Sequence, residues 1–234
     1  MHPGRVHPGR QLRGALSDGP ADLGAFVAAH TRPTRLPFLP SIVLHLGDQV
    51  VPLWSALETL LHAAAPTEPP FWAFPWVGGQ ALARFVLEQP AWVAGKRVLD
   101  FAAGCGVVAI AAARAGAARV EAAEIDLCAG AAIALNAAAN AVAIEVLLED
   151  VVGRDAGWDV VFAGDVCYQR GPSSHITAWL RELARTRPVF LADPGRAFLP
   201  DRGLSAVARW DIPAHADAEG VDARDTVVYR VVAD

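Results

Sequence analysis

Val98-Leu-Asp-Phe-Ala-Ala-Gly-Cys-Gly-Val-Val-Ala109 is the stretch of sequence that decides the fold. A short apolar run ends at the carboxylate of Asp100, two glycines follow at Gly104 and Gly106, and the Ala-rich segment 107–115 has helical character. Glycines let the backbone approach a ligand closely, and a helix start offers unpaired N–H groups. The order of strand, acid, glycine turn and helix therefore predicts a pocket for a nucleotide-type ligand.

Two ligand classes fit this turn. Gly104-x-Gly106-x-x-Ala109 also satisfies the dinucleotide pattern, which alone is weak evidence. Asp100 separates the interpretations, because a carboxylate beside the turn repels a pyrophosphate but suits a cation. S-adenosylmethionine has no phosphate and carries a sulfonium and an α-ammonium. We therefore expect a methyltransferase, with an NAD(P)-dependent oxidoreductase, an inactive cofactor-binding scaffold, or a plain acid-capped βα turn as alternatives.

Composition describes a folded chain that fits one α/β domain with a small N-terminal addition. Of its 234 residues, 53% are hydrophobic and 19% charged, and the net charge is −5. This charge gives no support to nucleic-acid binding, and no apolar run is long enough to predict a membrane span. Three scattered cysteines, expected as small buried residues, argue against a zinc site or a disulfide scaffold. We expect a cytoplasmic monomer without a metal site.

The N-terminal third is expected to form a tail and an extension. His-Pro-Gly-Arg occurs twice within residues 1–20, which we interpret as a disordered tail, although arginine without acid also suits a targeting segment. Residues 21–70 form the predicted extension. Its expected elements are a helix over 22–31, a hairpin of 42–46 with 49–51 around Gly47-Asp48, and a Leu-faced helix that ends before Pro66.

Residues 71–80 are unusually aromatic, and they open the predicted catalytic domain, 71–234. Two tryptophans and two phenylalanines stand beside a glycine pair, and a helix is expected from about Gly79 to Glu88. The segment is either an aromatic plug against the sheet or a lid over the ligand, with Trp76 or Gln80 in contact with it.

Repeated βα units follow the glycine turn. Strands are expected over 120–125, 145–148, 158–164 and 189–192, and helices over 126–140 and 175–187; residues 207–212 and 226–232 suit an antiparallel pair. This alternation predicts a mostly parallel, doubly wound sheet, whose ligands lie at the carboxyl ends of the strands.

Acidic side chains stand at those strand ends. They are Asp100, Glu124, Asp126, Asp150, Asp165 and Asp193. Glu124 is placed to accept from a ribose diol, and Asp150 or its neighbour Glu149 to accept from an adenine amino group. Asp126 fits a helix N-cap equally well.

With these residues in hand, the chain resembles the seven-strand, or class I, S-adenosylmethionine-dependent methyltransferases. Within them it is most similar to the electron transfer flavoprotein β-subunit lysine methyltransferase family. The resemblance runs from about Phe38 to the C-terminus. It rests on the segments 70–84, 95–106, Glu124-Ile-Asp126, Asn136, Gly164–Tyr168 and Asp193–Arg196.

The resemblance implies a Rossmann-like seven-stranded sheet, mostly parallel with the last strand antiparallel, and methylation of lysine on a protein such as the flavoprotein β subunit or a ribosomal protein. It also implies cofactor contacts, which would fall on Trp76, Asp100, Gly104, Gly106, Glu124, Asp126 and Asp150. Its D-x-x-Y motif is matched by Asp165 and Tyr168. A nicotinamide-like small-molecule substrate is the alternative.

The D-x-x-Y motif lies where the target lysine would enter. There Asp165 would orient the amine, and Tyr168 would line its channel or be only a packed aromatic. One departure is Ala102, where the family commonly has glycine or another small residue.

Overall fold

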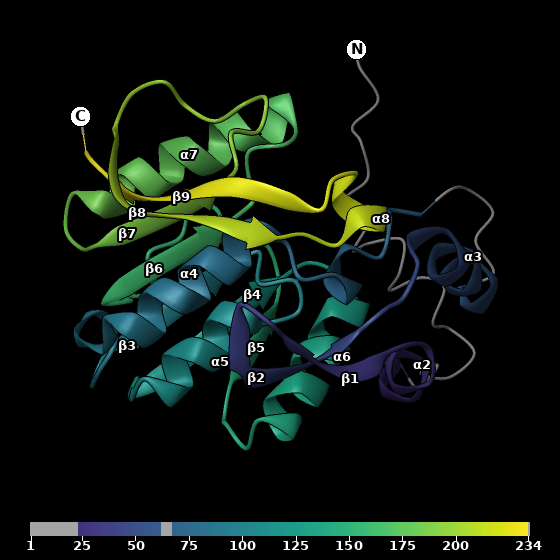
Figure 1. Ribbon diagram of the computed structural model, residues 1–234. Coiled ribbons are helices and arrows are strands. Elements are labelled where there is room, and N and C mark those ends of the chain that lie inside the picture. Colours follow the sequence, from purple (N-terminus) through teal and green to yellow (C-terminus); the bar gives the residue numbers. More distant parts are fainter. Residues whose placement is uncertain (1–22, 62–66, 234) are drawn as a thin grey trace, which may run out of the picture.

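The structure is a computed structural model that describes residues 23–61 and 67–233. The disordered tail predicted for residues 1–20 lies outside the described residues. Figure 1 shows the elements in chain order. They are α2 (Leu23–His30), β1 (Arg32–Leu36), β2 (Leu39–Leu46), α3 (Val50–Leu60), the 3-10 turns η1 (Phe71–Ala73) and η2 (Pro90–Trp92) on either side of α4 (Val77–Glu88), β3 (Arg97–Phe101), α5 (Val107–Arg114), β4 (Arg119–Glu124), α6 (Leu127–Ala139), β5 (Glu145–Leu148), β6 (Val160–Gly164), α7 (Arg170–Ala184), β7 (Val189–Asp193), β8 (Leu204–Pro213), α8 (Ala216–Glu219) and β9 (Ala223–Val231).

The main sheet has seven strands in the order β5-β4-β3-β6-β7-β9-β8. The pairs from β5 to β7 are all parallel, whereas β9 pairs antiparallel with both of its neighbours. The last strand is thus the one that runs against the others. This confirms the predicted seven-stranded, mostly parallel sheet with an antiparallel last strand.

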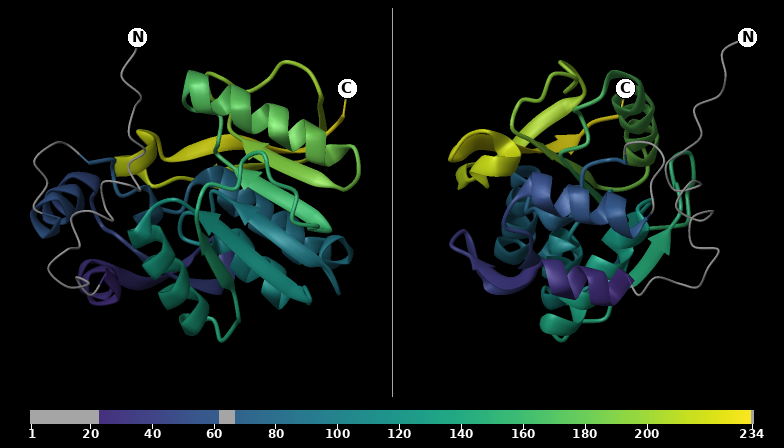
Figure 2. Two further views of the ribbon diagram at one scale, coloured as in Figure 1. Left: turned by 180° about the vertical axis from the view of Figure 1, so that it is seen from behind. Right: turned by 90° about the vertical axis from the view of Figure 1, so that its right-hand side faces the viewer.

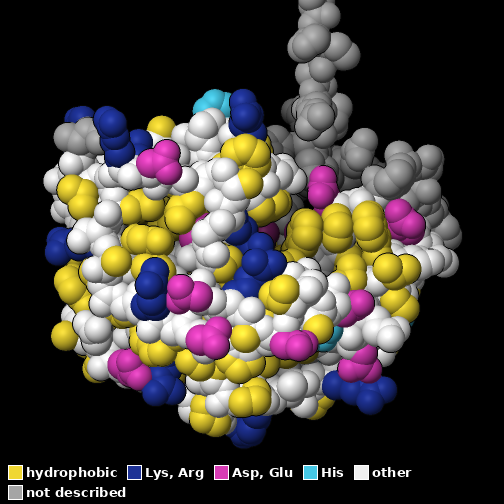
Figure 3. Space-filling view, turned by 45° about the horizontal axis from the view of Figure 1, so that its top comes forward, with side chains coloured by type: hydrophobic (Ala, Val, Ile, Leu, Met, Phe, Trp, Pro, Cys, Tyr) yellow, Lys and Arg dark blue, Asp and Glu magenta, His cyan; other side chains and the backbone are white. Residues whose placement is uncertain are grey.

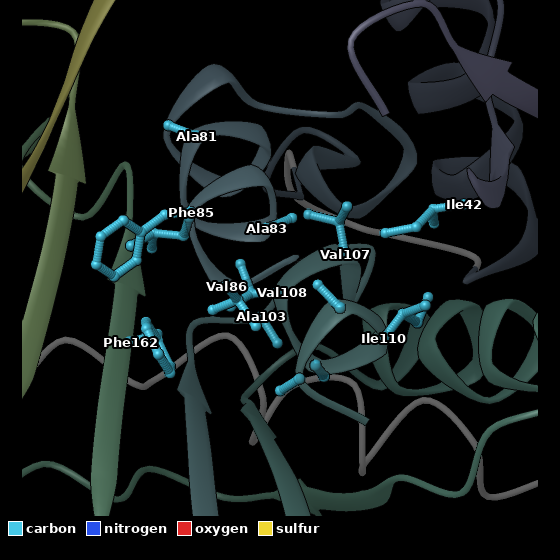
Figure 4. Packing of buried hydrophobic residues seen from close by; sticks show 14 of the residues in the cluster. Ile42, Ala81, Ala83, Phe85, Val86, Ala103, Val107, Val108, Ile110 and Phe162 are labelled. Atoms are coloured by element: carbon cyan, nitrogen blue, oxygen red, sulfur yellow. The ribbon is translucent and has the colours of Figure 1, made fainter. Parts of the chain in front are cut away.

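Helices cover both faces of this sheet (Figure 2). One face packs against α4 and α5 and against the hairpin of β1 and β2, whereas the other packs against α7. The strands alternate accordingly: Val98 and Phe162 belong to the first core and Leu99 and Val161 to the second. The close-up of the first core shows Phe85 of α4 and Phe162 of β6 in this cluster (Figure 4). Two-sided burial explains why the central strand β6 is continuously apolar.

The N-terminal hairpin differs from the prediction. It is formed by β1 and β2, whereas Val50 already begins α3. Pro33 lies in β1, an exposed edge strand where the missing N–H is tolerated. Gly47 is not a hairpin turn, because its N–H donates to the carbonyl of Ala73 at 2.9 Å. Val50 is the first residue of α3, and its N–H donates to the carboxylate of Asp217 at 2.6 Å, which stabilises this helix start.

Two helices begin earlier than predicted. α4 starts at Val77, two residues before Gly79, and α7 starts at Arg170, well before His175. Pro172 lies in the first turn of α7, where a proline removes no intrahelical hydrogen bond. The remaining predicted strands and helices are confirmed to within a few residues.

Two negative findings apply to residues 23–61 and 67–233 only. No helix there is long and apolar enough to cross a bilayer, and no group of three or more His, Cys, Asp or Glu side chains is placed to hold a metal. The cysteines Cys105, Cys128 and Cys167 are free and buried, as predicted.

Candidate active site

Four neighbouring parallel strands end in acidic residues, or next to them, at one edge of the sheet. Glu124 closes β4, Asp100 is the penultimate residue of β3, Asp165 follows β6 and Asp193 closes β7. Asp150 follows β5 at the end of the row. Parallel pairing places the carboxyl ends together, so the predicted row of acids is a single rim of the sheet.

The glycine turn is tied to this rim by two hydrogen bonds. The N–H of Ala109 in α5 donates to Asp100 at 2.9 Å, and the N–H of Gly104 donates to Glu124 at 2.7 Å. Gly106 caps α5 with a φ of +76°, and a Cβ there would approach Ile133 to 3.1 Å. Gly104, with a φ of +54°, would meet nothing within 4 Å, so the turn presents its backbone to open space.

Burial raises the pKa values of the two central carboxylates, those of Asp100 and Glu124. Loss of solvent raises the pKa of Asp100 to about 7, against the opposing hydrogen bond from Ala109. It also raises the pKa of Glu124 to about 7, against the hydrogen bond from Gly104. A cation beside Asp100 or a diol donating to Glu124 would favour the ionised forms. This environment suits a positively charged ligand better than a pyrophosphate.

Asp126 is the N-cap of α6, because its carboxylate accepts from the N–H of Cys128 at 2.7 Å. This confirms the capping role that the sequence suggested, while a cofactor contact by Asp126 stays a prediction. Asp150 accepts from the N–H of Val152 at 3.0 Å in the following turn. Its neighbour Glu149 pairs with Arg154 at 2.6 Å, so both carboxylates have partners within the protein.

The central residues of the aromatic segment 71–80 are buried against the core, as expected for a plug. Trp72 and Phe74 are fully buried in the core formed with α2, α3 and α6. Gln80 is also buried, and its side-chain amide donates to the carbonyl of Pro75 at 2.7 Å, so Gln80 belongs to the plug and not to a lid. Trp76 is only partly buried, with its indole N–H donating to Phe71 at 2.8 Å.

Asp165 lies where α4 meets β6 and β7. It is buried, and its backbone φ of +55° is one of the less common values that aspartate tolerates. Its Oδ2 accepts from the N–H of Gly78 at 2.5 Å, and its Oδ1 accepts from Arg196 at 2.5 and 2.9 Å. Burial raises the pKa of Asp165 to about 6, although Arg196 opposes this shift.

Tyr168 is not a packed core aromatic, since it is 51% exposed. Its ring lies 5.9 Å from that of Phe71, which in turn lies 5.7 Å from the ring of Trp76. An aromatic row thus runs from the loop that precedes α7 to the start of α4, beside the acid rim. Its exposure leaves Tyr168 available to a substrate.

Arg196 and Glu219 are two charged residues of this site whose roles sequence analysis missed. Arg196 bridges Asp165 and Glu219, the latter at 3.0 Å, and its guanidinium lies 5.4 Å from the centre of the Trp76 ring. The Asp193-Pro-Gly-Arg196 turn after a strand was the available signal. Nothing in the spacing indicated that its arginine would reach back to Asp165.

Two solved structures with a similar fold are methyltransferases. A magnesium protoporphyrin IX methyltransferase from Synechocystis PCC 6803 with bound S-adenosylmethionine matches with a TM-score of 0.53 and 15% identity, over 98% of this chain and 100% of that one. A Thermus thermophilus 16S rRNA methyltransferase matches with a TM-score of 0.52 and 18% identity, over 87% and 50%. At these identities the likeness shows the fold alone, which is the Rossmann-like fold of class I S-adenosylmethionine-dependent methyltransferases.

Sequence relatives narrow the class. Residues 81–165 match the family described as ribosomal protein L11 methyltransferase (PrmA). The electron transfer flavoprotein beta subunit lysine methyltransferase of Xenopus laevis is 35% identical over 213 residues, covering 88% of this chain and 85% of that protein. The Homo sapiens protein of the same name is 37% identical over 190 residues, covering 79% and 71%.

The chain belongs to the electron transfer flavoprotein beta subunit lysine methyltransferase family. It is therefore an S-adenosylmethionine-dependent protein-lysine N-methyltransferase, which decides against the oxidoreductase alternative.

Proposed function

We propose that the enzyme methylates lysine on the beta subunit of an electron transfer flavoprotein. The observation that carries this proposal is the match along 88% of the chain to a relative named for that substrate. The second candidate, a ribosomal protein, is supported only by the match over residues 81–165. That part holds the glycine turn, the proposed cofactor acids of the rim and Asp165, but it leaves out Tyr168 and covers less than half of the chain.

The residues of the rim fit S-adenosylmethionine. Asp100 and Glu124 are carboxylates with raised pKa values, and the backbone at Gly104 faces open space. We assign Asp100 and Gly104 to the methionine end, Glu124 to the ribose diol and Asp150 to the adenine amino group. Gly106, Asp126 and Trp76 complete the proposed cofactor contacts. When bound, the cofactor supplies an electrophilic methyl group on a cationic sulfur.

Asp165 and Tyr168 are the proposed substrate residues. Lysine has an ordinary pKa near 10.4, so at neutral pH it arrives mostly protonated and must lose its proton before it can attack. Asp165, at the end of the strand next to that of Asp100, would accept a hydrogen bond from the amine and orient it. Tyr168 would line the path of the side chain. Proximity and orientation then supply most of the acceleration, about 7–11 kcal/mol.

Purified enzyme, methyl-labelled S-adenosylmethionine and purified electron transfer flavoprotein test the substrate. Ribosomal protein L11 is the matched alternative substrate under the same conditions. Mass spectrometry of both proteins should place the label on lysine of the flavoprotein beta subunit and leave L11 unlabelled. Label on L11 alone, or label on no protein, would contradict the proposal.

A further inference from the structure

Both oxygens of Asp165 already have donors from the protein. The Gly78 N–H binds Oδ2, and the Nε and Nη2 groups of Arg196 bind Oδ1 in a fork. Arg196 is therefore the charged neighbour that any amine approaching Asp165 would meet.

Arg196 is itself held from several sides. The carboxylate of Asp193 accepts from the backbone N–H groups of Gly195 and Arg196 at 2.7 and 2.6 Å, which fixes the turn that carries the arginine. Glu219 of α8 accepts from the guanidinium at 3.0 Å, and the ring of Trp76 lies beneath it. The side chain is only 16% exposed. Such a contact set restricts the guanidinium to one position.

The groups that surround Asp165 come from four elements. Asp193 and Arg196 lie at and after β7, Glu219 lies in α8, and Arg224 of β9 pairs with Glu219 at 2.8 Å. The amide of Gly78 faces it from α4. With all of them ionised, three carboxylates meet two guanidiniums, so loss of Arg196 would leave three buried negative charges against one positive charge.

We propose that Arg196 is a positioning residue for methyl transfer, which keeps Asp165 ionised, aims its carboxylate and balances its charge. This inference rests on the proposed function, because it requires Asp165 to orient the substrate amine. An unbalanced carboxylate would hold lysine as the ammonium ion, which cannot attack a methyl group. Arg196 offsets that charge while leaving the carboxylate lone pairs in place, so the neutral amine can be oriented.

The pH profile of kcat/KM is the readout that a merely structural role would not move. The pKa of Asp165, raised by burial and held down by Arg196, is about 6, and a lower break in the profile is expected there. Arg196→Met should move this break upward by about one pH unit or more and lower kcat/KM at pH 7 by about tenfold or more. Arg196→Lys keeps the charge and should leave the break near its wild-type position.

Glu219→Gln should shift the break in the pH profile in the direction opposite to that expected for Arg196→Met. Glu219 raises the pKa of Asp165, and glutamine can still accept from Arg196, so the break should move to lower pH. This variant also decides the matter if Arg196→Met fails to fold. Arg209→Met is the control, since Arg209 is 68% exposed and pairs with Asp225 away from the site. Its profile should match that of the wild type.

Opposite shifts for Arg196→Met and Glu219→Gln, with unchanged affinity for S-adenosylhomocysteine, would support the inference. An unmoved break in both variants, in an enzyme whose wild type methylates lysine, would overturn the inference alone. If the wild type methylates no lysine under any condition, the proposed function fails and the inference falls with it.

Discussion

Ala102 carries a strained backbone next to the glycine turn. Its φ is +53°, in the left-handed region where a Cβ costs roughly 1 kcal/mol relative to glycine. Ala102→Gly should therefore raise the free energy of unfolding by about 0.5–1 kcal/mol, measured by urea denaturation. Ala118, exposed and outside the positive-φ residues, is the control, and Ala118→Gly should lower stability. An equal loss in both variants would disprove the strain at Ala102.

The raised pKa values of Asp100 and Glu124 predict how the enzyme responds to pH. In the folded state both pKa values are about 7, whereas in the unfolded chain they are near 4. Between these values the folded state holds protons that the unfolded chain has lost, so its stability falls as pH rises toward 7. A cofactor that favours the ionised carboxylates binds more tightly as the pH rises, because more of the carboxyl groups are then already ionised.

Calorimetry of S-adenosylhomocysteine binding at pH 6 and pH 8 measures this effect. Affinity should be higher at pH 8, and the increase in melting temperature on binding should be larger there. Affinity that is flat across this range, or higher at pH 6, would show that ionisation of the two carboxylates is not linked to cofactor binding.

Residue types at the site were predictable from sequence, but their partners were not. The position of each acid followed from where its strand ends, so the strand pattern alone was enough to place Asp100, Glu124 and Asp165 on one rim. The pairing of Asp165 with Arg196 depends on how two loops fold over adjacent strands. Those loop conformations have no periodic signal in the sequence.

At the scale of elements, the position of α4 depends on the glycines at its start. A Cβ on Gly78 would clash with the carboxylate of Asp165 and approach the Ala192 carbonyl to 2.6 Å, and a Cβ on Gly164 would come within 2.8 Å of the Gly79 nitrogen. Gly78→Ala should thus displace α4 from the strand ends, lower stability by about 1–3 kcal/mol and reduce turnover.

Gly171→Ala is the matched control for Gly78→Ala, because Gly171 also lies in the first turn of a helix but has open space around it. Thermal denaturation and turnover of the two variants should separate clearly, with Gly171→Ala close to the wild type. Equal behaviour of the two would mean that α4 does not need its close approach to β6.

Sequence periodicity predicted the elements of the sheet better than those of the extension. The βα units have strong alternation between apolar strands and helices, whereas the hairpin of β1 and β2 is fixed by distant side chains. Asn140, which caps the C-terminus of α6, and Asn136 within α6 accept hydrogen bonds from the β2 backbone N–H groups of Val43 and His45, at 3.0 and 2.7 Å. Contacts across more than 90 residues of sequence are invisible to a local pattern.

At the scale of the whole molecule, strand order brings together acids that are far apart in sequence. The order β5-β4-β3-β6-β7 aligns carboxylates that lie between positions 100 and 193 along one edge. The space-filling view shows basic, acidic and apolar side chains interspersed over the face that carries the C-terminal strands (Figure 3). The chain, whose net charge is −5, thus gathers carboxylates at one edge of the sheet, where Asp100, Asp165 and Asp193 are buried.

We propose a division of labour along this rim, in which Glu124 serves the cofactor and Asp165 serves the lysine. Calorimetric titration of S-adenosylhomocysteine into Glu124→Gln and Asp165→Asn, paired with methyl transfer by each variant, tests it most directly. Glu124→Gln should lose about tenfold or more in affinity, whereas Asp165→Asn should bind within about threefold of the wild type and lose about 100-fold in kcat. Loss of cofactor binding in Asp165→Asn, or wild-type turnover by that variant, would contradict the claim.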